Sequence, residues 1–252
     1  MQFFVADFSL IQKMPTINSG LCVCVLFIAI IATLVKQHHA KQQTINIINS
    51  HDKSADITCY AVRQGDFYSN HTPIGLRSSQ VIEFSILFRT SSARYLFPPT
   101  DDKGHLCSTS WNKLFGSSRC GPWVPHHDDS DRFVWRRSQE CLIYNGTHVI
   151  GEKRNCSSIN QIELAAYAYD HGQKPWEHQG TLLKEFKTKV NVEQWYKYKI
   201  TFNEQDTLYQ LYTAQQQLLE EQVINHRSCS LYKYGYKLWY YFGGQCPAPQ
   251  EV

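Results

Sequence analysis

The stretch WYKYKITF, Trp195–Phe202, alternates between two kinds of side chain along its whole length. One face carries the large apolar residues Tyr196, Tyr198, Ile200 and Phe202. The other face carries Trp195, Lys197, Lys199 and Thr201. A period of two with one apolar face is typical of an antiparallel strand that is buried on one side. This stretch therefore predicts a sheet protein.

Five other stretches share this richness in aromatic and β-branched residues, and turn residues separate them. They are residues 81–88 (VIEFSILF), 132–137 (RFVWRR), 161–169 (QIELAAYAY), 207–213 (TLYQLYT) and 236–242 (YKLWYYF). Residues 214–224 (AQQQLLEEQVI) are good helix formers, so a helix is the alternative there. Because both neighbours are predicted strands, we expect a turn and then a strand at Leu218–Asn225. The sequence thus predicts one all-β antiparallel sandwich domain over residues 55–249.

The composition excludes two classes of protein. The chain has 252 residues with 25 Lys and Arg against 22 Asp and Glu, and residues 42–252 hold 22 of the former and 21 of the latter. A nearly neutral domain argues against binding nucleic acid through a broad basic surface. Charged residues make up 19% and aromatic residues 13% of the chain, which excludes a disordered protein.

An apolar segment, residues 20–35 (GLCVCVLFIAIIATLV), stands apart near the N-terminus. With the uncharged residues 16–19 it reaches about 30 Å as a helix, the thickness of the hydrocarbon core of a membrane. We expect residues 16–35 to be a signal-anchor helix after a flank at 1–15, with a polar tether at 36–54. A cleaved signal peptide is the alternative, and a buried core helix is a third.

Two kinds of signal disagree about which side of the membrane the domain occupies. Lys36 and Lys41 follow the apolar segment and would keep the domain in the cytosol. Sequons at Asn70, Asn145 and Asn155, together with seven cysteines after residue 41, favour an extracellular or lumenal domain. Because these signals are independent of one another, we expect a single-pass membrane protein with an outside domain, or a secreted protein.

The seven cysteines suggest two local disulfides. Cys141 and Cys156 bracket Asn145-Gly146, a dipeptide typical of a type I′ hairpin turn. Cys107 and Cys120 would close a loop around residues 111–116. One of the remaining three, Cys59, Cys229 and Cys246, would be left as a thiol or as a link in a disulfide dimer. No C-x-x-C pair occurs, so we expect no zinc site, and no motif calls for a cofactor.

The C-terminal half resembles the concanavalin A-like jelly-roll group of lectins and glycan-active enzymes. The strings that carry the resemblance are WYKYKITF, TLYQLYT, LLEEQVIN and, over residues 235–249, GYKLWYYFGGQCPAP. A second cluster, WNKLFG at 111–116, HHDDSDRFVWR at 126–136 and QIELAAYAY, is similar to uncharacterised secreted jelly-roll proteins. The resemblance covers residues 55–249 and implies a jelly-roll sandwich of two curved sheets and a carbohydrate partner.

The catalytic signatures of that group are missing. The Glu-x-Asp-x-Glu string of family-16 glucanases does not occur, and Gln161-Ile162 is followed by Glu163 where jelly-roll alginate lyases have His. Gly-x-Ser-x-Gly, His-Glu-x-x-His and Walker strings are absent as well. The sequence therefore favours a protein without catalysis, although it leaves the question of an enzyme open.

Two groups of polar residues are candidates for a site. His126 and His127, followed by Asp128 and Asp129, offer nitrogen and carboxylate ligands, but adjacent residues point apart and no third spaced ligand follows. A polar loop is therefore favoured there over a metal site. Arg132 and Arg136 share one face of their predicted strand, and a guanidinium fork suits the carboxylate or sulfate of an acidic sugar. Ion pairs with Glu163 are the alternative.

Aromatic residues form the third candidate group. Tyr167, Tyr169, Trp239 and Tyr241 could stack on sugar rings or could belong to the sandwich core. We expect a glycan-binding domain without catalysis. The alternatives are an atypical polysaccharide lyase or glycoside hydrolase and a structural or adhesion ectodomain. Such an enzyme would draw its acid, base and charge-neutralising groups from Arg132, Arg136, His126, His127 and Tyr167.

Overall fold

The computed structural model describes residues 46–48, 57–58, 60–69, 75–96, 107, 110–146, 148–243, 246–250 and 252. The expected anchor at 16–35, its flank at 1–15, Cys59 and Asn70 lie outside the described residues, as does most of the tether at 36–54. Within the described part of the chain, no helix is long and apolar enough to cross a membrane.

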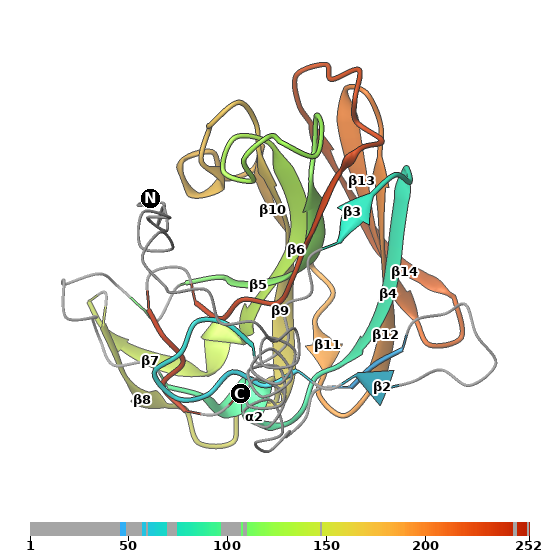
Figure 1. Cartoon of the computed structure of the whole chain (residues 1–252). Coiled ribbons are helices and arrows are strands. Elements are labelled where there is room, and N and C mark those ends of the chain that lie inside the picture. Colours follow the sequence, from blue (N-terminus) through green and yellow to red (C-terminus); the bar gives the residue numbers. More distant parts are fainter. Residues whose placement is uncertain are drawn as a thin grey trace, which may run out of the picture. The chain divides into compact units, whose positions relative to one another are not determined.

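Two antiparallel sheets make up the fold (Figure 1). The first has the strand order β14-β13-β12-β4-β1-β2, and the second has the order β10-β9-β6-β5-β15-β3 with β11 beside β9. The strands of the first sheet are β1 (Asn46–Ile48), β2 (Ile57–Thr58), β4 (Val81–Leu87), β12 (Trp195–Phe202), β13 (Asp206–Thr213) and β14 (Leu218–Asn225). Those of the second are β3 (Leu76–Arg77), β5 (Asn112–Ser118), β6 (Ser130–Arg137), β9 (Gln161–Tyr169), β10 (Leu183–Glu185), β11 (Val190–Asn191) and β15 (Gly235–Leu238).

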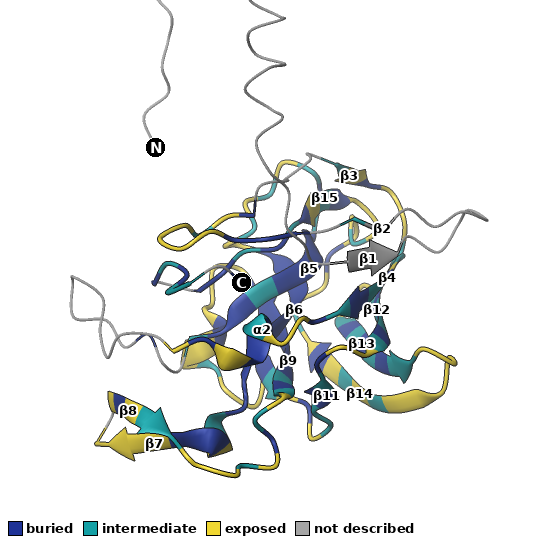
Figure 2. Cartoon of the chain, turned by 90° about the horizontal axis from the view of Figure 1, so that it is seen from below, coloured by how far each residue is buried: buried dark blue, intermediate teal, exposed yellow. Residues whose placement is uncertain are grey.

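Smaller elements complete the described chain. A separate hairpin is formed by β7 (Leu142–Asn145) and β8 (His148–Glu152), and its exposed surface is visible in Figure 2. One α-helical turn, α2 (Ser91–Arg94), and the 3-10 turns η2 (Gln139–Cys141) and η3 (Pro175–Glu177) are the helical elements of the described residues. The prediction of an all-β antiparallel fold is confirmed.

The strands follow the predicted patterns closely. In β12 the residues Tyr196, Tyr198, Ile200 and Phe202 are buried and their neighbours are only partly buried. The segment 218–225 is a strand that pairs with β13, so the alternative of a helix is wrong. The last predicted strand is shorter than expected, because β15 ends at Leu238 and Tyr241 makes only isolated bridges with Tyr68 and Lys113.

Aromatic rings from both sheets meet in the core. The ring of Phe133 on β6 lies 5.1 Å from that of Tyr198 on β12 and 5.4 Å from that of Tyr209 on β13. Trp135 belongs to the same buried cluster. The period of two therefore turns Arg132, Val134 and Arg136 of β6 toward the opposite face of the second sheet.

The disulfide expected between Cys141 and Cys156 is confirmed, with the two Cα atoms 5.5 Å apart. The pair Cys107–Cys120 is wrong, because Cys107 bonds Cys246 and Cys120 bonds Cys229. The seven residues of β5 lie between Cys107 and Cys120, and as a strand they span about 23 Å, which no disulfide bridges. Each of the two cysteines instead bonds a residue that the fold brings alongside from the C-terminal part.

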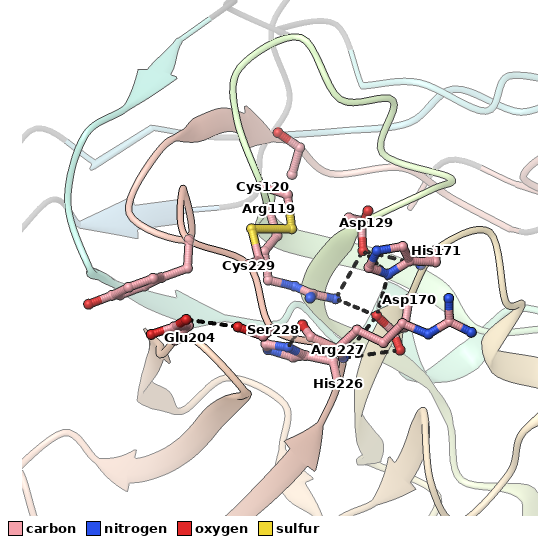
Figure 3. The surroundings of a disulfide bond; sticks show 12 residues. Arg119, Cys120, Asp129, Asp170, His171, Glu204, His226, Arg227, Ser228 and Cys229 are labelled. Atoms are coloured by element: carbon pink, nitrogen blue, oxygen red, sulfur yellow. Dashed lines mark hydrogen bonds and ion pairs between the residues drawn. A yellow bond between two sulfur atoms is a disulfide. The ribbon is translucent and has the colours of Figure 1, made fainter.

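A buried ionic cluster lies beside the Cys120–Cys229 bond (Figure 3). Nε of Arg119 lies 2.9 Å from a carboxylate oxygen of Asp131, and Nη2 lies 3.6 Å and 3.8 Å from oxygens of Asp129 and Asp170. The hydroxyl of Tyr209 on the first sheet donates to Asp131 at 2.9 Å. The cluster therefore joins the two sheets, and it holds Asp131 away from the face that Arg132 occupies.

One edge of the first sheet is β14. Much of this strand is exposed (Figure 2), including Leu218 and Leu219. The carboxylate of Glu220 accepts hydrogen bonds from the main-chain N–H groups of Lys187 at 3.0 Å and Thr188 at 2.7 Å. Contacts from the chain between β10 and β11 therefore cover part of this edge.

Candidate functional site

A cavity of about 980 Å³ lies over the second sheet, largely on the face that points away from the core. Four of its lining residues are basic side chains, Lys113, Arg132, Lys174 and Lys237, and Asp128 is the one acidic residue in its described lining. The rest of the wall is mostly aromatic. These rings belong to Tyr68, Trp111, Tyr167, Tyr169, Trp176, Tyr236, Trp239, Tyr240 and Tyr241.

The alternation of β5, β6 and β9 builds the floor of this cavity. Arg132 on β6 stands opposite Tyr167 on β9 in the strand register. On its other side Arg132 stands opposite Gly116 of β5, where the register shifts after Lys113. A Cβ atom on Gly116 would lie 2.1 Å from the carbonyl oxygen of Asp131 and 2.4 Å from Cβ of Arg132. Glycine therefore permits β5 to approach β6 closely at this point.

Arg132 is the unusual residue of the site. Its side chain is 7% exposed, makes no ion pair or hydrogen bond to any described residue, and has a buried Nε without a partner. The other buried arginines, Arg77, Arg119 and Arg137, all donate to acceptors. Burial lowers the pKa of Arg132, but a guanidinium remains charged at neutral pH. A buried cation without a counter-charge is costly, so its place at a cavity indicates an anionic ligand.

Lys113 is a second cation in the same place. Its Nζ donates to the carbonyl oxygen of Trp111 at 2.8 Å and lies 4.6 Å from the centre of the Tyr167 ring. No described carboxylate forms an ion pair with it. Burial, and to a smaller extent the charge of Arg132, lowers the pKa of Lys113 to about 7.

His126 and Tyr236 form a contact at the rim. The main-chain N–H of His126 donates to the Tyr236 hydroxyl at 2.8 Å, and Nδ1 of the same histidine lies 3.1 Å from that hydroxyl. Burial, followed by the charges of Arg132 and His127, lowers the pKa of His126 to about 4. The imidazole is therefore neutral at neutral pH, and its Nδ1 is able to accept a hydrogen bond from the Tyr236 hydroxyl, whose pKa burial raises.

Most of the residues singled out from the sequence converge here. His126, His127, Arg132, Tyr167, Tyr169, Trp239 and Tyr241 all line the cavity. Arg136 does not, because its Nε bonds Glu163 at 2.8 Å and its guanidinium lies 4.0 Å from the centre of the Trp111 ring. The alternative of an ion pair with Glu163 is thus the right one for Arg136.

Trp111, Lys113 and Tyr236 also line the cavity, although the sequence did not mark them as candidates. Lys113 follows Trp111 by two residues, so the period of two would have placed both on one face once the segment had been recognised as a strand. Tyr236 carried no comparable signal, because its partner His126 lies 110 residues away along the chain.

The possible metal ligands at residues 126–129 do not gather around one point. Asp129 turns away from His126 and His127 and meets Asp170 and His171, with one ligand atom of each within 4.8 Å of the others. The guanidinium of Arg119 already lies between the two carboxylates and offsets part of their charge (Figure 3). We therefore assign no metal to this cluster.

Comparisons with known proteins give little guidance. No protein-family model matches this chain, and no curated protein matches it. Among solved structures, it is similar to the CBM2 module of the evolved Dit protein of Lactobacillus casei BL23 phage J-1, at 10% sequence identity and a TM-score of 0.21. The match covers 85% of this chain and 88% of the other. A similarity of this size carries no argument about the function of this chain.

Proposed function

We propose that this protein binds an acidic carbohydrate in the cavity over β5, β6, β9 and β15. The observation that carries the proposal is Arg132, a buried guanidinium at the cavity wall with no acceptor among the described residues. A carboxylate or sulfate group would supply the missing counter-charge through paired hydrogen bonds.

The aromatic wall supports a sugar as the carrier of that anion. Tyr169 contacts both Tyr167, with ring centres 5.8 Å apart, and the 49% exposed Trp176, with ring centres 6.1 Å apart. Flat rings with polar ends suit a ligand that offers C–H groups on its faces and hydroxyls on its edges. These contacts fit a glycan better than a small inorganic ion.

The setting proposed for this activity is outside the cell, on a membrane-anchored or secreted protein with a concanavalin A-like jelly-roll domain. Three disulfides are typical of an oxidising compartment. Asn145 and Asn155, the sequon residues within the described chain, are both exposed. These observations favour the setting, and the binding proposal does not depend on it.

The test is a binding panel of uronic-acid and sulfated oligosaccharides beside neutral ones, applied to the full chain. We expect acidic oligosaccharides to bind, and Arg132→Gln to weaken their binding by about 10- to 100-fold through the loss of a charged hydrogen-bond pair. The matched control is Lys197→Gln, which removes a cation that is paired with Glu83 on β4 and lies outside the cavity. Equal binding of neutral oligosaccharides, or full binding by Arg132→Gln, would contradict the proposal.

A lyase is the second candidate, and the contact between His126 and Tyr236 favours it. In such a reaction a base removes the proton beside the sugar carboxylate, and the glycosidic oxygen leaves with a proton as a carbon–carbon double bond forms. Arg132 would neutralise the carboxylate, and the Tyr236 hydroxyl would move a proton. The double bond absorbs ultraviolet light, so we would expect a signal that Tyr236→Phe removes. A wild-type protein that binds acidic oligosaccharides without this signal is a lectin.

A further inference from the structure

Two cations lie together at the cavity wall without a neighbouring carboxylate. Lys113 on β5 and Arg132 on β6 are close enough that the charge of Arg132 lowers the pKa of the lysine, and neither forms an ion pair with any described residue. Arg119, in contrast, has a counter-charge, since its Nε lies 2.9 Å from a carboxylate oxygen of Asp131. The pair therefore carries positive charge that no described carboxylate balances through an ion pair.

The groups that face Lys113 come from every element around it. Arg132 faces it from β6, the ring of Tyr167 from β9, and His127 from the loop before β6. Main-chain hydrogen bonds in both directions join it to Tyr241 of the C-terminal segment. Lys174 and Lys237 add positive charge to the wall. Asp128 is exposed, and its negative charge partly offsets the lowering of the His127 pKa by burial. None of these groups compensates an ammonium on Lys113.

We propose that Lys113 binds the anionic group of the ligand together with Arg132, and that it takes up its proton from solvent as that group enters. This inference rests on the proposed function, because it assigns a binding role and a pH dependence to the same cavity. It makes Lys113 a second ligand-binding cation.

The sign of the pH dependence follows from the two states of the lysine. In the empty cavity the pKa of Lys113 is about 7, and an anion beside it would raise that pKa toward its ordinary value. At pH values below the lower pKa the lysine is already charged, so affinity is constant. Above it, binding must add a proton, so affinity falls by up to about tenfold per pH unit until the higher pKa is reached.

The pKa shifts of the neighbouring cavity groups move those groups away from this window. The pKa of His126 is about 4 and that of His127 is also lowered by burial. Burial raises the pKa values of Tyr167, Tyr169 and Tyr241 above the ordinary tyrosine value. A sulfate ion stays fully charged throughout, so it is a suitable probe of the lysine alone.

The experiment follows the NMR signal of the Lys113 Cε carbon against pH in the full chain, with and without sodium sulfate. We expect a titration midpoint near neutral pH that moves upward when sulfate is added. Sulfate affinity should fall between about pH 6.5 and about pH 8.5 in the wild type. It should be weaker and independent of pH in Lys113→Met, and strong and independent of pH in Lys113→Arg.

Lys197→Gln is again the control, and it should keep the slope of the wild type. Sulfate affinity that is the same at both pH values, or a Lys113 midpoint that sulfate does not move, would overturn the inference. That result is distinct from a failure of the proposed function. In the latter case the oligosaccharide panel shows no acidic binder, whatever the behaviour of Lys113 with sulfate.

Discussion

Arg119 and Arg132 are both buried beside the same aspartate, yet their surroundings are opposite. Arg119 bonds Asp131 and donates to the carbonyl oxygen of Tyr169 at 2.8 Å. Arg132 follows Asp131 directly and points to the other face of the sheet, where no described acceptor meets it. The alternation of one strand thus assigns the first arginine to the interior and the second to a ligand.

Replacement of each arginine by methionine tests this difference. Arg119→Met should lower the free energy of unfolding by about 3–5 kcal/mol, because it leaves buried carboxylates without their partner. Arg132→Met should leave the free energy of unfolding unchanged or raise it, since it removes an unpaired buried charge. Urea unfolding curves of the two variants provide the measurement. A large destabilisation by Arg132→Met would show that an acceptor holds this arginine in the folded protein.

Two buried tyrosines on adjacent strands offer a second comparison. The hydroxyl of Tyr209 donates to Asp131, whereas the hydroxyl of Tyr198 has no partner among the described residues. Tyr209→Phe should cost about 1.5–3 kcal/mol of stability, since the lost hydrogen bond is to a charged group. Tyr198→Phe should be neutral or slightly stabilising, because it removes an unsatisfied buried hydroxyl. Thermal unfolding of the two variants side by side would reveal equal losses if this reasoning is wrong.

At the scale of the element, the register shift in β5 is decisive for the site. The shift after Lys113 brings Gly116 against Arg132 and lets Trp111 and Lys113 share the cavity face. No side chain larger than hydrogen fits at Gly116, because a Cβ atom there would meet the backbone of β6 at 2.1 Å.

We therefore expect Gly116→Ala to destabilise the protein by about 1–3 kcal/mol and to weaken binding of acidic oligosaccharides. Gly151→Ala on β8 is the matched control, since no atom lies within 4 Å of its added Cβ. That change should alter stability by less than about 0.5 kcal/mol. Calorimetric melting temperatures and the binding panel measure both effects, and a harmless Gly116→Ala would mean that β5 moves away from β6 without loss.

The strands that were predicted, β12 and β9 among them, could be recognised because each carries its own pattern. The period of two in β12 and β9 depends only on residues within the strand, and even the helix-forming residues of β14 are overridden by the strands beside them. The pairing of Cys107 with Cys120 could not be corrected in the same way. The correct pairing depends on the extended β5 between Cys107 and Cys120 and on the path of the C-terminal chain. Neither can be inferred from the residues next to the two cysteines.

At the scale of the whole molecule, the site could be predicted only as far as it depends on residues within one strand. Arg132, Tyr167 and Tyr169 were candidates because their own strands showed which residues share a face. Tyr236 and Trp111 join them only through the order β9-β6-β5-β15, which no single stretch encodes. The sequence therefore placed several residues of the cavity wall on shared strand faces, and the sheet order brought them together with the rest of the wall.

Two disulfides connect distant parts of the domain, Cys107 with Cys246 and Cys120 with Cys229. A single one of these disulfides closes a loop of 139 or 109 residues. When both are present, the first bond already brings the ends of the second together, so the second bond closes a loop of only about 30 residues. Removal of both should therefore cost about 1 kcal/mol more than the sum of the two single removals. Paired Cys→Ser variants and calorimetry measure these costs. Strict additivity would indicate that loop entropy is not the main contribution.

The edge strand β14 has a consequence for self-association. Residues 184–188 cover the middle of this edge, but the exposed Leu218 and Leu219 at its start are a template on which a second copy could extend the sheet. Glu220 is held by Lys187 and Thr188, but the exposed Glu221 places a negative charge on this edge, so two copies brought together would repel each other. Concentrated solutions should thus remain monodisperse at neutral pH. Glu221→Gln should turn the same edge into a starting point for aggregates, which light scattering would detect.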